Sequence, residues 1–106
     1  MHPALLALVA AAIAALPAAA AAQRSGEQVV RYQCALCHGP GVGGAPRIGD
    51  REAWDKRRGA GFESLVRSAL DGRGAMPPNG GLADLSEAEL RAAIAYMLQK
   101  SGASQD

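Results

Sequence analysis

Cysteine, histidine and aromatic side chains are scarce in this chain of 106 residues, and its net charge is close to zero. Eleven basic side chains are balanced by ten acidic ones, so the chain lacks the basic excess that nucleic-acid binding needs. We therefore expect no nucleic-acid partner. One Phe, one Trp and two Tyr supply all of the aromatic bulk. A chain this short with so few large side chains has a weak hydrophobic core of its own.

Strand patterns and internal repeats are absent as well, and apolar residues instead recur at helical spacing. The first predicted helix begins after Ser25, which can form a weak capping box with Gln28, and it runs into the chain's two cysteines. Its expected buried stripe consists of Val29, Tyr32 and Leu36. The sequence therefore predicts an all-α fold.

Three further helices are predicted, which makes about four in total. One extends from a cap at Asp50 to Arg58, where Gly59 is expected in a left-handed conformation. The next ends at Gly72, and the last follows a capping box at residues 86–89. The apolar faces of these last two helices consist of Phe62, Leu65, Val66, Ala69 and Leu70, and of Leu90, Ile94, Met97 and Leu98.

Residues 1–22 have the pattern of an export signal. They contain an apolar run rich in Ala and Leu, and they end in small residues of the kind that signal peptidase accepts. An uncleaved membrane anchor is the alternative, because about 20 apolar residues can span a bilayer. Pro17 and the Ala-rich composition favour cleavage. We therefore expect a cleaved signal peptide, a periplasmic location and one mature domain of residues 23–106, with a frayed tail from Ala103.

Cys34, Cys37 and His38 form a Cys-x-x-Cys-His run, which is typical of covalent haem attachment. Each thiol can add to a vinyl group of the haem, and the adjacent imidazole can bind the iron. A structural zinc site needs four ligands and a thioredoxin-like redox pair needs a βαβ context, and the sequence offers neither. A plain disulfide stays open as an alternative, although it leaves His38 and the glycine-rich loop after it without a role.

The iron needs a second ligand opposite His38. Met76 lies in a predicted loop and precedes two prolines, whereas Met97 lies on an apolar helix face, where methionine usually fills the core. We therefore predict Met76 as the second axial ligand, with a hydrophobic plug as the alternative role. A His/Met pair is typical of electron-transfer haem sites. With both axial positions filled, a substrate cannot easily bind the iron, so the pattern favours electron transfer over catalysis.

Further contacts to the cofactor are expected from neighbouring segments. A backbone carbonyl in residues 44–46 should accept a hydrogen bond from the second ring nitrogen of His38. Trp54 is expected either to contact the haem, by packing or by donating its indole N–H to a propionate, or to pack in the core. Arg47 and Arg51 can pair with propionates or remain exposed loop charges.

Together these motifs resemble a class I c-type cytochrome, and most closely the cytochrome c5 subgroup. The similarity extends over nearly all of the mature chain. It is carried by residues 32–38, 43–46, 49–50, 53–54, 76–81, 83–86 and 93–97.

The resemblance implies a small all-α fold of about four helices wrapped round one covalently bound haem c. It implies thioether links at Cys34 and Cys37, and iron ligation by His38 and Met76. It also implies that the Pro46 carbonyl accepts from His38. The first and last helices would cross, which brings Gly26 and Val30 near Tyr96.

The resemblance also implies a periplasmic carrier of single electrons that is not an enzyme. We expect a monomer that exchanges electrons with soluble redox proteins or membrane-bound respiratory complexes. A haem-based sensor of small ligands and a haem subunit of a larger oxidoreductase complex are the alternatives. Members of the subgroup often carry an extra Cys pair where this chain has Leu82 and Leu85. The loop there must be held by packing and by its prolines.

The haem-free protein is expected to show no cooperative thermal transition. The chain has few large core residues, and haem stabilises the native state because it binds that state and not the unfolded chain. Thermal circular dichroism of the haem-free and haem-loaded proteins checks this expectation. A cooperative transition in the haem-free chain would contradict it.

Overall fold

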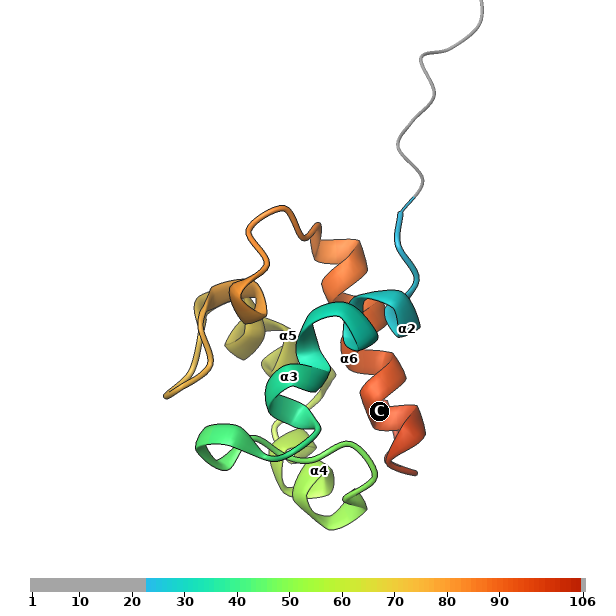
Figure 1. Ribbon diagram of the computed structural model, residues 1–106. Coiled ribbons are helices and arrows are strands. Elements are labelled where there is room, and N and C mark those ends of the chain that lie inside the picture. Colours follow the sequence, from blue (N-terminus) through green and yellow to red (C-terminus); the bar gives the residue numbers. More distant parts are fainter. Residues whose placement is uncertain (1–22, 106) are drawn as a thin grey trace, which may run out of the picture.

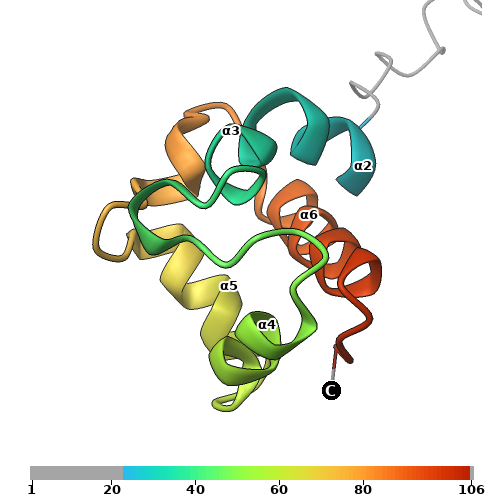
Figure 2. The same ribbon diagram turned by 60° about the horizontal axis from the view of Figure 1, so that its bottom comes forward.

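Helices form nearly all of the regular structure in the computed structural model, which describes residues 23–105 (Figures 1 and 2). The first helix is a continuous rod of α2 (Gly26–Val29), a π-helical stretch (Val30–Cys34) and α3 (Ala35–His38). It is followed by α4 (Arg51–Arg58), α5 (Phe62–Asp71) and α6 (Glu87–Lys100). No strand forms within the described residues, so the predicted all-α fold with about four helices is confirmed.

Two short 3-10 turns lie in the loops, at Val42–Gly44 and Pro78–Gly81. The export signal predicted for residues 1–22 lies outside the described residues. Among the helices of residues 23–105, none combines the length and the apolar character that crossing a bilayer requires.

The first helix begins where the sequence predicts but buries a different face. The Ser25 side chain accepts from the Gln28 N–H at 3.1 Å, and the Gln28 side chain accepts from the Ser25 N–H at 2.8 Å. The predicted stripe is wrong beyond Val29, because Tyr32 is 69% exposed and Leu36 is 64% exposed. The wide π turn contains one extra residue, which rotates the following positions around the helix axis. Val30 is buried in their place.

Helix α4 has the predicted bounds, with the Asp50 side chain accepting from the Ala53 N–H at 3.1 Å. Its expected left-handed stop at Gly59 is wrong, because that residue has φ −53° and stays right-handed. The positive φ lies two residues later, at Gly61 with φ 97°, and leads directly into α5. Helix α5 ends as predicted before Gly72, which has φ 85°.

Helix α6 has clear local signals at both ends. The Ser86 side chain accepts from the Glu89 N–H at 3.1 Å, and Glu89 accepts from the Ser86 N–H at 3.0 Å, which is the predicted capping box. At the other end Gly102 has φ 71°, and the Ala103 N–H donates to the Leu98 carbonyl at 2.9 Å. Ala103 is therefore buried and bonded, and the prediction that the tail frays from this residue is wrong.

The first helix crosses α6 at Gly26, in the arrangement that the family resemblance implies (Figure 2). A Cβ atom at Gly26 would overlap the backbone carbonyl of Ala92, so the two helix backbones touch here and only glycine fits. The core around this crossing draws on every helix. Its buried apolar residues are Val29, Val30, Trp54, Val66, Ala69, Leu85, Leu90, Ala93, Ile94, Met97, Leu98 and Ala103.

The loop between α5 and α6 is held by packing, as expected from its lack of cysteine. Leu85 is buried in the core and Leu82 packs against it. At the start of the loop, Arg73 and Met76 exchange two backbone hydrogen bonds, of 2.9 and 2.8 Å. The loop thus leaves α5 in a closed turn that presents Met76.

An ion pair joins the start of the described chain to α6. Arg24 donates to Glu89 through its backbone N–H at 2.9 Å, its Nε at 2.7 Å and its Nη2 at 3.0 Å. Glu89 is buried, and it also caps α6 through Ser86. The Arg24 side chain, together with backbone N–H groups, holds the pKa of Glu89 well below its usual range.

Glu89→Gln is expected to lower the urea midpoint of the haem-loaded protein at neutral pH. The folded state favours the ionised form of Glu89. The Glu89 carboxylate therefore stabilises the folded protein above about pH 4.3, which is the pKa of a glutamate in the unfolded chain. This stabilisation decreases as the pH falls below that value. The gap between wild type and variant should therefore narrow below about pH 4, because Glu89 of the unfolded wild-type chain then binds a proton before Glu89 of the folded chain does, whereas the glutamine of the variant does not titrate. Urea titrations over a pH series measure the gap.

Glu27→Gln is the matched control for this prediction. Glu27 also pairs with an arginine, Arg31 at 2.8 Å, but on an exposed helix surface, where an ion pair contributes little. Its midpoint should follow wild type at every pH. A Glu89→Gln gap that stays constant with pH would show that the carboxylate charge is not the stabilising feature.

Candidate functional site

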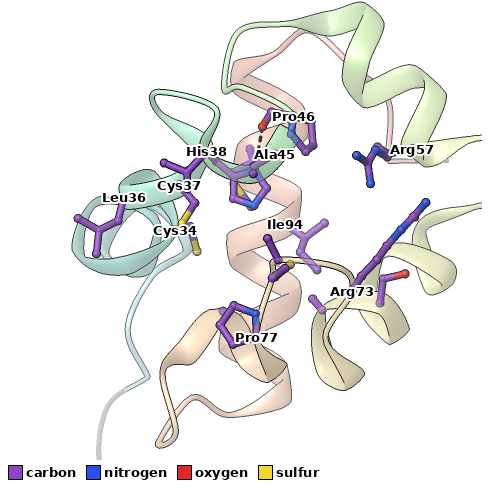
Figure 3. Close-up of a pocket in the computed structure, with 18 of the residues that line it drawn as sticks. Cys34, Leu36, Cys37, His38, Ala45, Pro46, Arg57, Arg73, Pro77 and Ile94 are labelled. Carbon is purple, nitrogen blue, oxygen red and sulfur yellow. Dashed lines mark hydrogen bonds between the residues drawn. The ribbon is translucent and has the colours of Figure 1, made fainter.

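A cavity of about 270 Å³ lies in the middle of the fold, bounded by the first helix, α5, α6 and the loops between them (Figure 3). Its walls are mostly apolar, with Leu65, Ala69 and Ile94 among them. Six of the site residues predicted from the sequence meet at this cavity. They are Cys34, Cys37, His38, Pro46, Trp54 and Met76.

His38 lies at the end of α3 and is buried. Its Nδ1 is 2.8 Å from the Pro46 carbonyl oxygen, which is the contact expected from the sequence. A carbonyl can only accept, so Nδ1 carries a proton, and in the neutral imidazole Nε2 then has the free lone pair (Figure 3). The backbone is anchored too, because the Ile48 N–H donates to the His38 carbonyl at 2.8 Å. The imidazole is thus held in the tautomer that can bind a metal.

Trp54 supports this imidazole from α4. The two rings stack with centroids 5.4 Å apart and an interplanar angle of 28°. The indole Nε1–H donates to the Arg47 carbonyl at 2.9 Å. In this structure a loop carbonyl thus accepts the indole proton, for which the sequence suggested a propionate as one alternative partner. Trp54 lines the cavity and, by stacking on the His38 ring, helps to fix the orientation of that ring.

Met76 reaches the cavity from the loop after α5, and Pro77 after it lies across the cavity from His38 (Figure 3). Pro77 is extended, with φ −73° and ψ 162°, and leads into the 3-10 turn Pro78–Gly81. Met97 also lines the cavity, but it is buried in the core on α6, as predicted. The two thioethers therefore differ in setting: Met76 lies on a loop and Met97 on a packed helix.

Cys34 and Cys37 lie beside His38 on one side of the cavity (Figure 3). Cys34 is half-buried, Cys37 is exposed, and no disulfide joins them. Burial raises the pKa of the Cys34 thiol, so the reactive thiolate is disfavoured.

Two arginines that the sequence analysis did not single out face the cavity. Arg57 and Arg73 lie on the side away from the cysteines (Figure 3). The expected cations are elsewhere: Arg47 donates to the Gly39 carbonyl at 3.2 Å, and Arg51 pairs with Asp55 at 3.5 Å. The sequence did contain a signal for Arg73, because this residue lies only three positions before Met76, the predicted iron ligand.

These features fit a haem. The cavity offers apolar walls, an imidazole with a free nitrogen, a thioether on another wall and two thiols at one side. The guanidinium groups of Arg57 and Arg73, at the opposite side of the cavity, can bind the propionate carboxylates of a haem. Within residues 23–105, no group of three or more His, Cys, Asp and Glu side chains is placed to hold a metal ion by itself. The imidazole and the thioether are ligand types that suit an iron held in a macrocycle.

Comparison with known proteins gives a consistent result. The family model described as "Cytochrome C oxidase, cbb3-type, subunit III" matches residues 21–97. Cytochrome c5 of Azotobacter vinelandii is 47% identical over 76 residues, which cover 70% of this chain and 92% of that protein. Cytochrome c-555 of Chlorobaculum tepidum is 38% identical over 81 residues, covering 73% and 75% of the two chains.

Solved structures agree with this result. A chain in the crystal structure of an electron transfer complex of nitrite reductase with cytochrome c is 45% identical, with a TM-score of 0.68. The match covers 72% of this chain and 93% of that one. A mono-haem ferrocytochrome c from Shewanella putrefaciens is 35% identical, with a TM-score of 0.64 and coverages of 73% and 95%.

Proposed function

Because this chain belongs to the cytochrome c family, we propose that it carries single electrons between redox partner proteins in the periplasm. The observation that carries the proposal is that His38 and Met76 line the same cavity. Two protein ligands on one iron leave no open position for a substrate. Electron transfer is then the chemistry that remains.

The cofactor is one covalently bound haem c, which supplies an iron that changes reversibly between two oxidation states. In our proposal Cys34 and Cys37 hold it through thioether links, and Nε2 of His38 and the Met76 sulfur bind the iron. Pro46 keeps the His38 ring in place through its carbonyl, at 2.8 Å from Nδ1. Arg57 and Arg73 pair with the propionate carboxylates of the haem.

The cavity residues have two tasks during electron transfer. The apolar side chains of Leu65, Ala69 and Ile94 exclude water, which limits the solvent rearrangement that accompanies a change of charge. His38 and Met76, which line the cavity, would hold the iron from the protein in both oxidation states, so little rearrangement of the protein would accompany the transfer of an electron. The soft thioether also raises the reduction potential relative to a second imidazole.

The location and the partners belong to the same proposal. The apolar residues 1–22 have the pattern of a cleaved export signal, which supports the periplasm. A similar chain has been crystallised in an electron transfer complex with nitrite reductase, which supports redox proteins as the class of partner. We propose a monomer that exchanges electrons with soluble or membrane-bound redox proteins.

A haem subunit of a larger oxidoreductase complex is the second candidate. The description of the matching family model, which names an oxidase subunit, favours it. The similarity to cytochrome c5 favours the free carrier, because this chain matches 92% of that small protein. We take the free carrier as the better-supported function.

Met76→Ala is expected to abolish the methionine-to-iron charge-transfer band of the oxidised protein. Met97→Ala should keep the band, because Met97 fills the core, and should instead lower the free energy of unfolding by about 2–5 kcal/mol. Absorption spectra and urea titrations of both haem-loaded variants measure these effects. Loss of the band in Met97→Ala alone would reverse the axial assignment.

Carbon monoxide separates an electron carrier from a ligand sensor. The reduced wild-type protein should bind little carbon monoxide at neutral pH, because Met76 occupies the iron. Met76→Ala should bind it promptly. Spectra recorded under carbon monoxide provide the measurement, and prompt, complete binding by wild type would overturn the carrier function.

A further inference from the structure

Gln33 joins the two segments that meet at the cavity. It directly precedes Cys34, it is half-buried, and its side chain lines the cavity. Its Nε2–H donates to the Gly80 carbonyl oxygen at 2.9 Å, across 47 positions of sequence. Gly80 lies in the 3-10 turn Pro78–Gly81, just after Met76. The bond therefore connects the haem-attachment helix to the methionine loop.

The segment from Met76 to Leu82, here called the methionine loop, has an unusual backbone conformation that is stabilised by hydrogen bonds within the loop. Asn79, Gly80 and Gly81 have φ values of 55°, 62° and 85°, three left-handed residues in a row. Within the loop, the Gly80 N–H donates to the Pro77 carbonyl at 3.0 Å, and the Leu82 N–H donates to Asn79 at 3.2 Å. These bonds define the turn, but they do not attach it to the helix that carries His38.

The Gln33 amide is seated directly against this turn. A Cβ atom at Gly81 would lie 3.3 Å from Gln33 Nε2 and 3.4 Å from Pro77 Cγ. A Cβ atom at Gly80 would lie 3.9 Å from the Met76 methyl carbon. Gly80 is thus next to Gln33 on one side and to the end of the Met76 side chain on the other. A hydrogen bond that fixes the Gly80 carbonyl therefore also restricts where the Met76 side chain can lie.

We propose that Gln33 is a positioning residue that fastens the Met76 loop to the attachment helix and so keeps Met76 on the iron against competing ligands. The inference rests on the proposed function, since it requires Met76 as the axial ligand. Gln33 itself does not touch the iron. Its role is to raise the cost of swinging the loop away, because the Gly80 carbonyl then loses its donor.

The test is imidazole binding to the oxidised, haem-loaded protein, followed by loss of the methionine-to-iron band. Gln33→Ala removes the side chain, and Gln33→Glu keeps its size but replaces the donor with an acceptor. Both should bind imidazole about 2- to 12-fold more tightly than wild type, the range expected for losing one hydrogen bond between neutral groups. Gln99→Ala, at an exposed position on α6, is the matched control and should be unchanged.

Each contrary result has a distinct meaning. A change in only one of the two Gln33 variants overturns the inference, because side-chain volume or charge would then be the cause. Wild-type affinity in both variants also overturns it, even where the urea midpoint falls, because Gln33 would then be merely structural. If wild type itself lacks the band, the axial role of Met76 fails, and the inference fails with it.

Discussion

The contact between Gly26 and the Ala92 carbonyl is the constraint on which the rest of the structure depends. With no side chain in between, the first helix and α6 pack backbone to backbone. This crossing sets the direction in which the first helix continues, and therefore where Cys34, Cys37 and His38 lie. It also directs Ile94 and Met97 of α6 into the cavity. Gly26, which has no Cβ atom, thus allows the helix that carries the Cys-x-x-Cys-His motif to lie close to the α6 residues that line the cavity.

The loops around the cavity are held by a shared device. They are rich in glycine and proline, so they have few side chains to pack, but their carbonyls are free to accept. Helix side chains supply the donors: His38 to Pro46, Trp54 to Arg47 and Gln33 to Gly80, at 2.8 to 2.9 Å. A small domain can in this way keep two irregular loops in place around a large apolar cofactor, and the two proposed iron ligands stay on different walls.

Local signals made much of the fold predictable. The capping boxes at Ser25 and Ser86 and the Asp50 cap involve residues three positions apart, so they form without help from the rest of the chain. The apolar stripe of α6 was also predictable, because its helix is regular throughout. The stripe of the first helix was not, since a π turn shifts the inward positions. Nothing in the local residue types indicated this turn.

The sequence by itself determined the chemistry of this protein: two thiols and an imidazole in a Cys-x-x-Cys-His run, one methionine in a loop, and helices long enough to enclose a haem. These are properties of residue types and short spacings, which exist before the chain folds. The tertiary structure decided which cations face the cavity, Arg57 and Arg73 in place of Arg47 and Arg51. It also decided that Trp54 serves a loop carbonyl and that Gln33 meets Gly80. Such pairings join residues whose proximity depends on how the helices cross, and no local pattern contains that information.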